Sequence, residues 1–385
     1  MTTGDNVSIW RSRYLTDLGC AQPTVAWNPP APYTDIWSPE LQRSGRRWYI
    51  YFAADMNSNN VTHRIYVLRS LGRNPMGPYR FMGKLKGMAD QWAIDPTVLH
   101  LAGTSYLVWS GWLGLHNRVQ RLFIARMAGP LEVSGHATVI SSPTFPWEQS
   151  VAPINEGPVA LQRRGRTFIV FSADASWSNA YALGLLSLRG KNPMRASAWV
   201  KSPSPVFSSA NGVFGPGHAS FVKAGTQWWI VYHAAAFSGA GWDRNIFTQP
   251  FRWSSAGTPV FGAPRSPTSW IPLPRGTPAR YTAQVEKLAG GAGVAQIAVP
   301  ASGAYCAWLH FSNASGGASM EFWTADGKPQ LDLTFPSTGT SPNTNVGTLI
   351  TAVDLHSGTN ALRFAESAPD VSAQIRWVQV SPMKR

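Results

Sequence analysis

The stretch INEGPVALQRRGRTFIVFSAD, residues 154–174, shows the pattern that decides the fold. A short apolar strand with Pro158 near its start leads into a turn at Gly165, and an aromatic-rich strand follows. The same order of strand, glycine turn and strand occurs elsewhere in the chain, with turns at Gly45, Gly103 and Gly225. Successive turns are 58, 62 and 60 residues apart. Each copy predicts a strand–turn–strand hairpin.

A third strand follows each hairpin. The four copies span residues 63–70, 120–127, 181–188 and 244–251. A fifth copy, NVSIWRSRYL, stands at residues 6–15, 58 residues before its counterpart when Ser12 is aligned with Ser70. Repeats of about 60 residues with three or four strands each are typical of propeller blades. The chain is therefore expected to be all-β, with a five-bladed β-propeller over residues 1–265.

The number of hairpins does not match the number of third strands, because there are five third strands and four opening hairpins. One period back from Gly45 falls about fifteen residues before Met1. We therefore expect the innermost strand of the first blade to be missing from this chain, as in a fragment or after a misassigned start. A C-terminal strand that closes the ring remains an alternative.

Composition supports the all-β expectation and narrows the possible partners. The chain has 18 Trp, 35 Gly and 30 Pro, and only 14% of its residues are charged. Its net charge is +14, but the arginines stand singly or in pairs such as Arg46-Arg47, so no nucleic acid partner is expected. No apolar run approaches the length of a membrane span, and no signal-peptide core follows Met1. Trp-rich β proteins often bind sugars, although core packing explains any single Trp equally well.

The two cysteines, Cys20 and Cys306, fall in different predicted domains. Two such residues indicate neither a disulfide framework nor a metal site.

Candidate functional residues come from the first strand of each blade, which lines the central channel of a propeller. At that position the sequence offers Ser38, Asp95, Glu156 and His218. Asp95 and Glu156 are 61 residues apart but should face each other across one cavity. Neighbouring buried acids have raised and separated pKa values, as acid–base cleavage of a glycosidic bond requires. The alternative for an isolated Asp-Pro or Glu-Gly-Pro is turn formation.

The motifs TDIWSPEL, WAIDPTVLH, INEGPVAL and GPGHASF resemble successive blades of glycoside hydrolase family 43, in the family's order and spacing. The chain is most similar to the α-L-arabinofuranosidase type. The resemblance implies an inverting enzyme in which Glu156 is the general acid and Asp95 modulates the pKa of that acid. The family's general base lies at an Asp-Pro of the strand expected upstream of Met1. Asp5, Asp17 and Asp35 do not fit that position.

The resemblance also suggests further site residues. His218 matches the family's central histidine, which borders an ion such as Ca²⁺ in the channel, and no cofactor is required. Arg244 matches an arginine that faces substrate or acid. A packed core imidazole and a surface charge are the respective alternatives. The remaining candidates for substrate binding are Trp37, Trp92, Trp112 and Asn155; blade packing is the alternative for the tryptophans.

Residues 266–279 are rich in Pro, Gly and Ser and are expected to form a linker. Residues 280–385 show alternating strands, as in a β-sandwich. Tyr281, the G-x-Y at 303–305 and the closing IRWVQV resemble carbohydrate-binding modules of families 6 and 35. Structural Ca²⁺ is not expected in this module, because the family's acidic ligands are replaced here by Thr282, Gln284 and Arg376.

The resemblance implies a secreted, monomeric, exo-acting α-L-arabinofuranosidase that releases terminal arabinose from arabinan or arabinoxylan of the plant cell wall. A β-xylosidase, an endo-arabinanase and a non-catalytic sugar-binding remnant are the alternatives. Because inversion needs a base, the chain as numbered is expected to be close to inactive.

Overall fold

The protein is described from a computed structural model over residues 4–114, 116, 119–288, 292–314, 318–323, 329–340, 346–366 and 373–383. Its regular structure in these ranges is β-strand, with short 3₁₀ helices at Leu15–Cys20 (η1), Pro146–Glu148 (η2) and Ala196–Ala198 (η3). The all-β prediction is confirmed. None of the helices in these ranges has the length and apolar character needed to cross a membrane.

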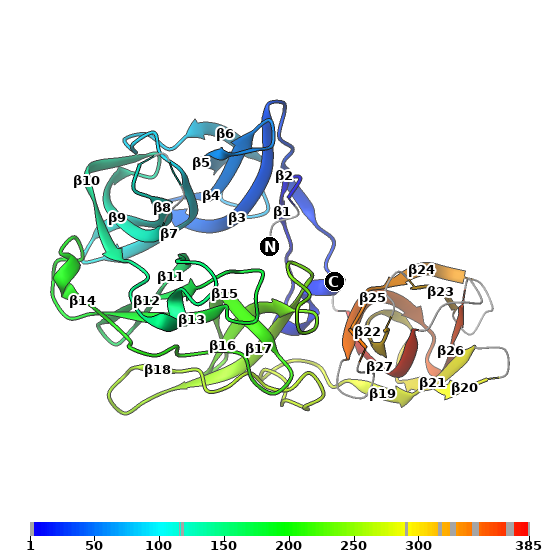
Figure 1. Ribbon diagram of the computed structural model, residues 1–385. Coiled ribbons are helices and arrows are strands. Elements are labelled where there is room, and N and C mark those ends of the chain that lie inside the picture. The colour runs from blue at the N-terminus through cyan, green and yellow to red at the C-terminus, as the bar shows by residue number, and fades with distance from the viewer. Residues whose placement is uncertain are drawn as a thin grey trace.

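Four four-stranded antiparallel sheets are arranged around a common centre as propeller blades (Figure 1). The second blade contains β3 (Tyr33–Ser44), β4 (Arg47–Met56), β5 (Asn59–Ser70) and β6 (Tyr79–Lys84). The third contains β7 (Ala93–Leu101), β8 (Thr104–Trp112), β9 (Gln120–Gly129) and β10 (Glu132–Ser141). The fourth contains β11 (Asn155–Arg163), β12 (Arg166–Ala173), β13 (Ala182–Leu188) and β14 (Trp199–Lys201). The fifth contains β15 (Phe214–Ala224), β16 (Gln227–Ala235), β17 (Arg244–Trp253) and β18 (Pro259–Val260). The predicted hairpins and third strands lie in these elements.

The first blade is the short pair β1 (Val7–Ile9) and β2 (Thr24–Trp27) in the described residues. Val7 is buried beside Ile36 and Phe52 of the second blade, which holds β1 against the ring. The strand predicted over residues 6–15 is shorter than expected, because the chain leaves the sheet after Ile9 and turns into η1.

The first strand of each complete blade carries a β-bulge at the same place. In β7 the pairing steps from Ile94–Ser110 to Thr97–Val108, which leaves Asp95 and Pro96 outside the ladder. The first bulged residue has a positive φ in every blade: Ser38 (50°), Asp95 (53°), Gly157 (51°) and His218 (47°). Bulges redirect side chains, and a positive φ is uncommon outside glycine. The chain therefore changes direction at the same place in the first strand of each complete blade.

The C-terminal strands form two packed sheets beside the propeller (Figure 1). One sheet contains, in order, β19 (Tyr281–Gln284), β27 (Gln374–Pro382), β22 (Gly303–Ser312) and β25 (Gly347–Leu355). The other contains β20 (Glu286–Lys287), β21 (Gly293–Val299), β26 (Gly358–Glu366), β23 (Ala318–Trp323) and β24 (Pro329–Phe335). Their shared core includes Phe311, Phe335 and Phe364. Residues 261–280, which include the predicted linker, contain no strand or helix.

A disulfide between Cys20 and Cys306 joins η1 of the propeller to β22 of the C-terminal sandwich, with 5.7 Å between the two Cα atoms. The expectation that these cysteines would indicate no disulfide was wrong, because they are 286 residues apart and only the fold brings them together. Next to the bond, the Arg280 guanidinium lies 3.7 Å from the ring centre of Trp308, a cation–π contact. Cys20 of the propeller also packs with Trp308, Ile350 and Met383 of the sandwich, so the two parts of the chain are joined covalently and by packing.

Candidate active site

Asp95 and Glu156 come from the first strands of adjoining blades, β7 and β11. The Gly157 main-chain N–H donates to Oδ2 of Asp95 at 2.9 Å, and the Ser38 hydroxyl donates to Oδ1 of the same carboxylate. Asp95 is only 5% exposed. Residues from three successive blades thus meet at one carboxylate, as the shared position in the repeat predicts.

Glu156 is held by two hydrogen-bond donors. The Tyr181 hydroxyl donates to Oε1 at 2.8 Å, and Nε2 of Gln120 donates to Oε2 at 3.0 Å. Burial, followed by the negative charge of Asp95, raises the pKa of Glu156 to about 7, against the opposing effects of Tyr181, Gln120 and Arg244. A carboxylic acid with this pKa retains its proton near neutral pH and can still release it, which suits a general acid.

Glycine is required where Tyr181 approaches the acid. A Cβ at Gly217 would lie 1.9 Å from a carbon of the Tyr181 ring, so a side chain there would push the tyrosine away from Glu156. At Gly157 the φ of 51° also disfavours a side chain, and a Cβ would meet Nδ1 of His218 at 3.1 Å. The two glycines of the NEGP and GPGH motifs therefore make room for the tyrosine and the histidine.

The structure places Arg244 facing the acid. Its Nη1 lies 3.1 Å from Nε2 of His233, and its Nη2 donates to the Ser176 carbonyl at 2.9 Å. Burial and the positive charge of Arg244 lower the pKa of His233 to about 2, so the imidazole is neutral and accepts the hydrogen bond. The positive charge of Arg244 also acts on Glu156, where it lowers the pKa. The two hydrogen bonds hold Arg244 in place, and its positive charge acts on the carboxyl group of Glu156.

His218 lies against Gly157, donates its main-chain N–H to the Ser172 hydroxyl at 2.8 Å, and has its ring 6.0 Å from that of His233. Calcium takes about six to eight oxygen ligands, mostly carboxylates and carbonyls. Within the described ranges, no group of three or more His, Cys, Asp or Glu residues is placed to hold a metal ion. This finding covers acidic, histidine and cysteine ligands alone, so the ion expected beside His218 stays a prediction.

The predicted tryptophans form a layered cluster next to Asp95. Trp37 stacks on His63 with 3.9 Å between ring centres, and Trp92 stacks on Trp112 with 4.3 Å between ring centres. Trp92 and Trp112 are only 6% and 2% exposed. Trp37 occupies the register position in β3 that Glu156 has in β11, directly before the bulge. Of the three tryptophans, Trp37 is therefore the one at the strand position equivalent to that of Glu156. Trp37 packs against the cluster that contains Trp92 and Trp112.

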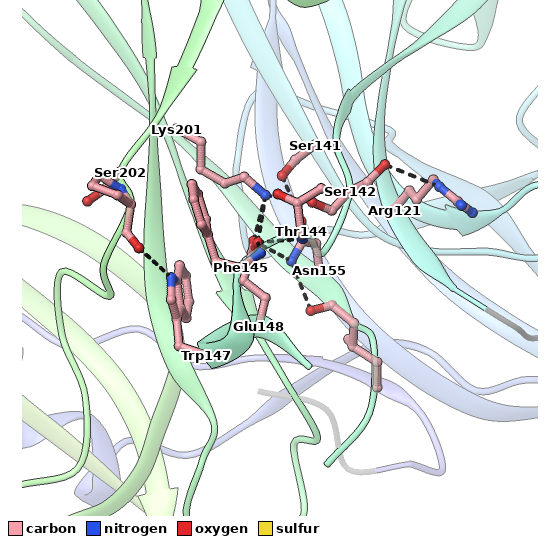
Figure 2. Close-up of polar contacts among 12 residues, drawn as sticks. Arg121, Ser141, Ser142, Thr144, Phe145, Trp147, Glu148, Asn155, Lys201 and Ser202 are labelled. Atoms are coloured by element: carbon pink, nitrogen blue, oxygen red, sulfur yellow. Dashed lines mark hydrogen bonds and ion pairs between the residues drawn. The ribbon is translucent and has the colours of Figure 1, made fainter. Parts of the chain in front are cut away.

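Asn155 belongs to a buried polar network with Ser141 and Glu148 (Figure 2). Its Nδ2 donates to Oε1 of Glu148 at 3.0 Å, and its Oδ1 accepts from the Ser141 hydroxyl at 2.6 Å. Glu148 is fully buried and forms an ion pair with Lys201 at 2.7 Å. The side chain of Asn155 therefore ties the start of β11, the strand that carries Glu156, to Glu148 and Ser141. Its predicted contact with substrate stays a prediction.

Most of the residues that surround Glu156 were not predicted from the sequence. Tyr181, Gln120 and Arg244, which contact or face the acid, and His63 beneath Trp37 are the opening residues of the four third strands at 181, 120, 244 and 63. The repeat alignment contains this signal, but the family resemblance indicated Arg244 alone.

A further half-buried carboxylate, Glu40, lies on β3 two residues after Ser38. It accepts a hydrogen bond from the Thr97 hydroxyl at 2.7 Å, and burial raises its pKa to about 7. Glu40 therefore links β3 of the second blade to β7 of the third blade, the strand that carries Asp95.

Comparison with known proteins matches the chain to one family of glycosyl hydrolases and to arabinofuranosidases. The family model of glycosyl hydrolases family 43 matches residues 1–259. The extracellular exo-α-(1→5)-L-arabinofuranosidase of Streptomyces avermitilis is 34% identical over 68% of this chain and 57% of its own length. The α-L-arabinofuranosidase 43 of Humicola insolens is 31% identical over 97% of this chain and 76% of its own length. The chain thus spans a little over half of the first relative and three quarters of the second.

Solved structures agree with the fold. The α-L-arabinofuranosidase of Lactobacillus brevis has a TM-score of 0.65 and 30% identity, covering 70% of this chain and 89% of that one. An exo-β-1,3-galactanase of Phanerochaete chrysosporium covers 98% of this chain with a TM-score of 0.55 at 16% identity, which shows a shared two-part fold alone. With the match over residues 1–259, these findings establish that the chain belongs to glycosyl hydrolases family 43.

Proposed function

We propose that the protein is an exo-acting α-L-arabinofuranosidase that releases terminal arabinofuranose from arabinan or arabinoxylan side chains. The observation that carries the proposal is the half-buried Glu156, whose pKa is raised to about 7 by desolvation and by the charge of Asp95. The relatives from Streptomyces avermitilis and Humicola insolens are named as arabinofuranosidases, which supports this sugar specificity.

The hydrogen bonds of Glu156 favour the form that it takes after proton transfer. Tyr181 and Gln120 both donate to its carboxyl oxygens, which stabilises the carboxylate once the proton has left. In the reaction the bond from the anomeric carbon to the leaving oxygen breaks, and that oxygen receives the proton from Glu156. Water adds to the anomeric carbon from the opposite side and loses its proton to a base, with inversion. Arg244 stabilises the carboxylate that Glu156 becomes.

We propose that the protein acts outside the cell on plant cell-wall polysaccharide. Disulfides persist in oxidising compartments and are rare in the cytosol, and the chain has one between Cys20 and Cys306. The relatives from Streptomyces avermitilis and Streptomyces chartreusis are named as extracellular enzymes.

The test replaces Glu156 with Gln and follows the release of arabinose from α-1,5-arabinotriose. Glu156→Gln should lower the rate about 10²-fold or more, because the amide supplies no proton. A dinitrophenyl arabinofuranoside, whose leaving group needs little protonation, should lose less. Glu132→Gln removes an exposed carboxyl group on β10 and is the matched control. Release of xylose from a β-xyloside in place of arabinose, or an unaltered rate in Glu156→Gln, would overturn the proposal.

A further inference from the structure

Two exposed tryptophans lie side by side on the propeller. Trp177 is 43% exposed and Trp242 is 69% exposed, and their ring centres are 5.6 Å apart at an interplanar angle of 67°. Two large apolar side chains left open next to each other indicate a contact surface rather than core packing. Both indoles offer faces on which the C–H groups of a sugar ring can stack.

The pair lies at the same end of the propeller as the acid. Strand pairing joins Asn155 to Ala173 and Ala173 to Ala182, so the loop at 174–181, which carries Trp177, is at the Glu156 end of the fourth blade. In the fifth blade, Phe214 pairs with Ala235 and Ala235 with Arg244. The loop at 236–243, which carries Trp242, is therefore at the corresponding end.

Hydrogen bonds fix these two loops to each other. Nδ2 of Asn179 donates to the Ser238 hydroxyl at 2.7 Å, and the Gly239 main-chain N–H donates to Oδ1 of Asn179 at 3.2 Å. Nε1 of Trp242 donates to the Ser176 hydroxyl at 3.3 Å. Because the loops are joined before any ligand arrives, less conformational entropy is lost when a ligand binds there.

The same loops contain residues that contact or face the acid. Arg244, two residues after Trp242, donates to the carbonyl of Ser176, the residue before Trp177. Tyr181, at the end of the first loop, donates to Glu156. An acid catalyst must stand beside the oxygen that leaves, so the sugar attached to that oxygen lies on the Glu156 side of the cleaved bond. The tryptophan pair stands on the two loops that lie at the Glu156 end of their blades, next to Tyr181 and Arg244.

We propose that Trp177 and Trp242 form a platform for the pentose ring of the leaving chain, the unit directly attached to the arabinose that is released. This inference rests on the proposed arabinofuranosidase function and adds to it a binding site for the second sugar. Substrates with a sugar as leaving group use the platform, and substrates with a leaving group that has no ring do not.

The experiment compares α-1,5-arabinotriose with α-L-arabinofuranosyl fluoride in the wild type, Trp177→Ala and Trp242→Ala. Each substitution should lower kcat/KM for the triose about 10-fold or more, and leave kcat/KM for the fluoride within about twofold. Trp177→Phe, which keeps an aromatic face, should recover most of the triose activity. Trp270→Ala is the matched control, because Trp270 is 70% exposed and packs near Trp377 of the C-terminal sheet.

The results separate the platform from the proposed function. An equal loss on both substrates, no loss on the triose, or the same loss in Trp270→Ala would overturn the platform and leave the arabinofuranosidase proposal in place. A full-length enzyme that contains its general base and cleaves neither substrate would overturn the proposed function and the platform with it.

Discussion

The main-chain N–H of Gly157 donates a 2.9 Å hydrogen bond to Oδ2 of Asp95. Gly157 directly follows Glu156, and it takes the bulge position in β11 that Asp95 takes in β7. The negative charge that raises the pKa of the acid is thus tied across two blades to the acid's own backbone. The fold couples the two carboxyl groups mechanically as well as electrostatically.

Asp95→Asn should shift the basic limb of the pH profile of kcat/KM to lower pH. The charge of Asp95 is the second cause of the raised pKa of Glu156, so its removal lowers that pKa and deprotonates the acid at lower pH. The asparagine retains an oxygen for Ser38 or Gly157. A basic limb that stays in place, with an unaltered rate, would exclude Asp95 from this role.

Tyr181→Phe should shift the same limb in the opposite direction. The tyrosine hydroxyl donates to Oε1 of Glu156 and thereby favours the charged form, so its loss raises the pKa of the acid. Tyr232→Phe is the matched control, because Tyr232 is also a buried tyrosine but its hydroxyl pairs with Gln249. Shifts of the limb in both variants, or in neither, would contradict the prediction.

Lys201→Met should strongly destabilise the fourth blade. It leaves the fully buried Glu148 without its cation, and breaking a buried ion pair costs about 3–5 kcal/mol. Lys84→Met breaks an exposed pair with Asp90, whose side chain is 72% exposed, and should cost about 0–1 kcal/mol. Urea unfolding of both variants measures the difference in stability. Equal midpoints would show that the buried pair contributes no more to the free energy of unfolding than the exposed pair.

Cys20→Ser should lower the free energy of unfolding by about 2–4 kcal/mol, because the bond to Cys306 closes a long loop in the unfolded chain. Thermal unfolding of the wild type in a thiol reductant should approach that of the variant. The reductant should leave the melting temperature of the doubly substituted Cys20→Ser, Cys306→Ser chain unchanged. A wild type insensitive to reductant at its melting temperature would contradict the prediction.

The periodic part of the fold could be predicted from the sequence. Hairpins that recur at 58 to 62 residues leave few arrangements other than blades, and the blade positions of Asp95 and Glu156 then imply that the two residues meet. The meaning of the register within β11 could not be obtained in this way. The sequence shows that Asp95 is one residue before its proline and Glu156 two, but only strand pairing shows that Asp95 lies in the bulge and Glu156 stands before it.

Contacts between residues far apart in the sequence were the least predictable. The partners of Glu156 depend on how neighbouring blades pack, and Tyr181 reaches it only because Gly217 has no side chain. The pairing of Cys20 with Cys306 depends on where the C-terminal sandwich docks. The cysteine pair leaves no spacing pattern in the chain, whereas Tyr181 opens a repeated third strand, and the repeat gives its position but not its contact with Glu156.

The bond between Cys20 and Cys306 also determines what a protease can separate. Residues 261–280 contain no strand or helix and are the expected site of cleavage between the two parts. A single cut there would produce two polypeptides that still migrate as one species until a thiol is added. A molecule nicked by a protease would therefore keep its C-terminal sandwich for as long as the disulfide stays oxidised.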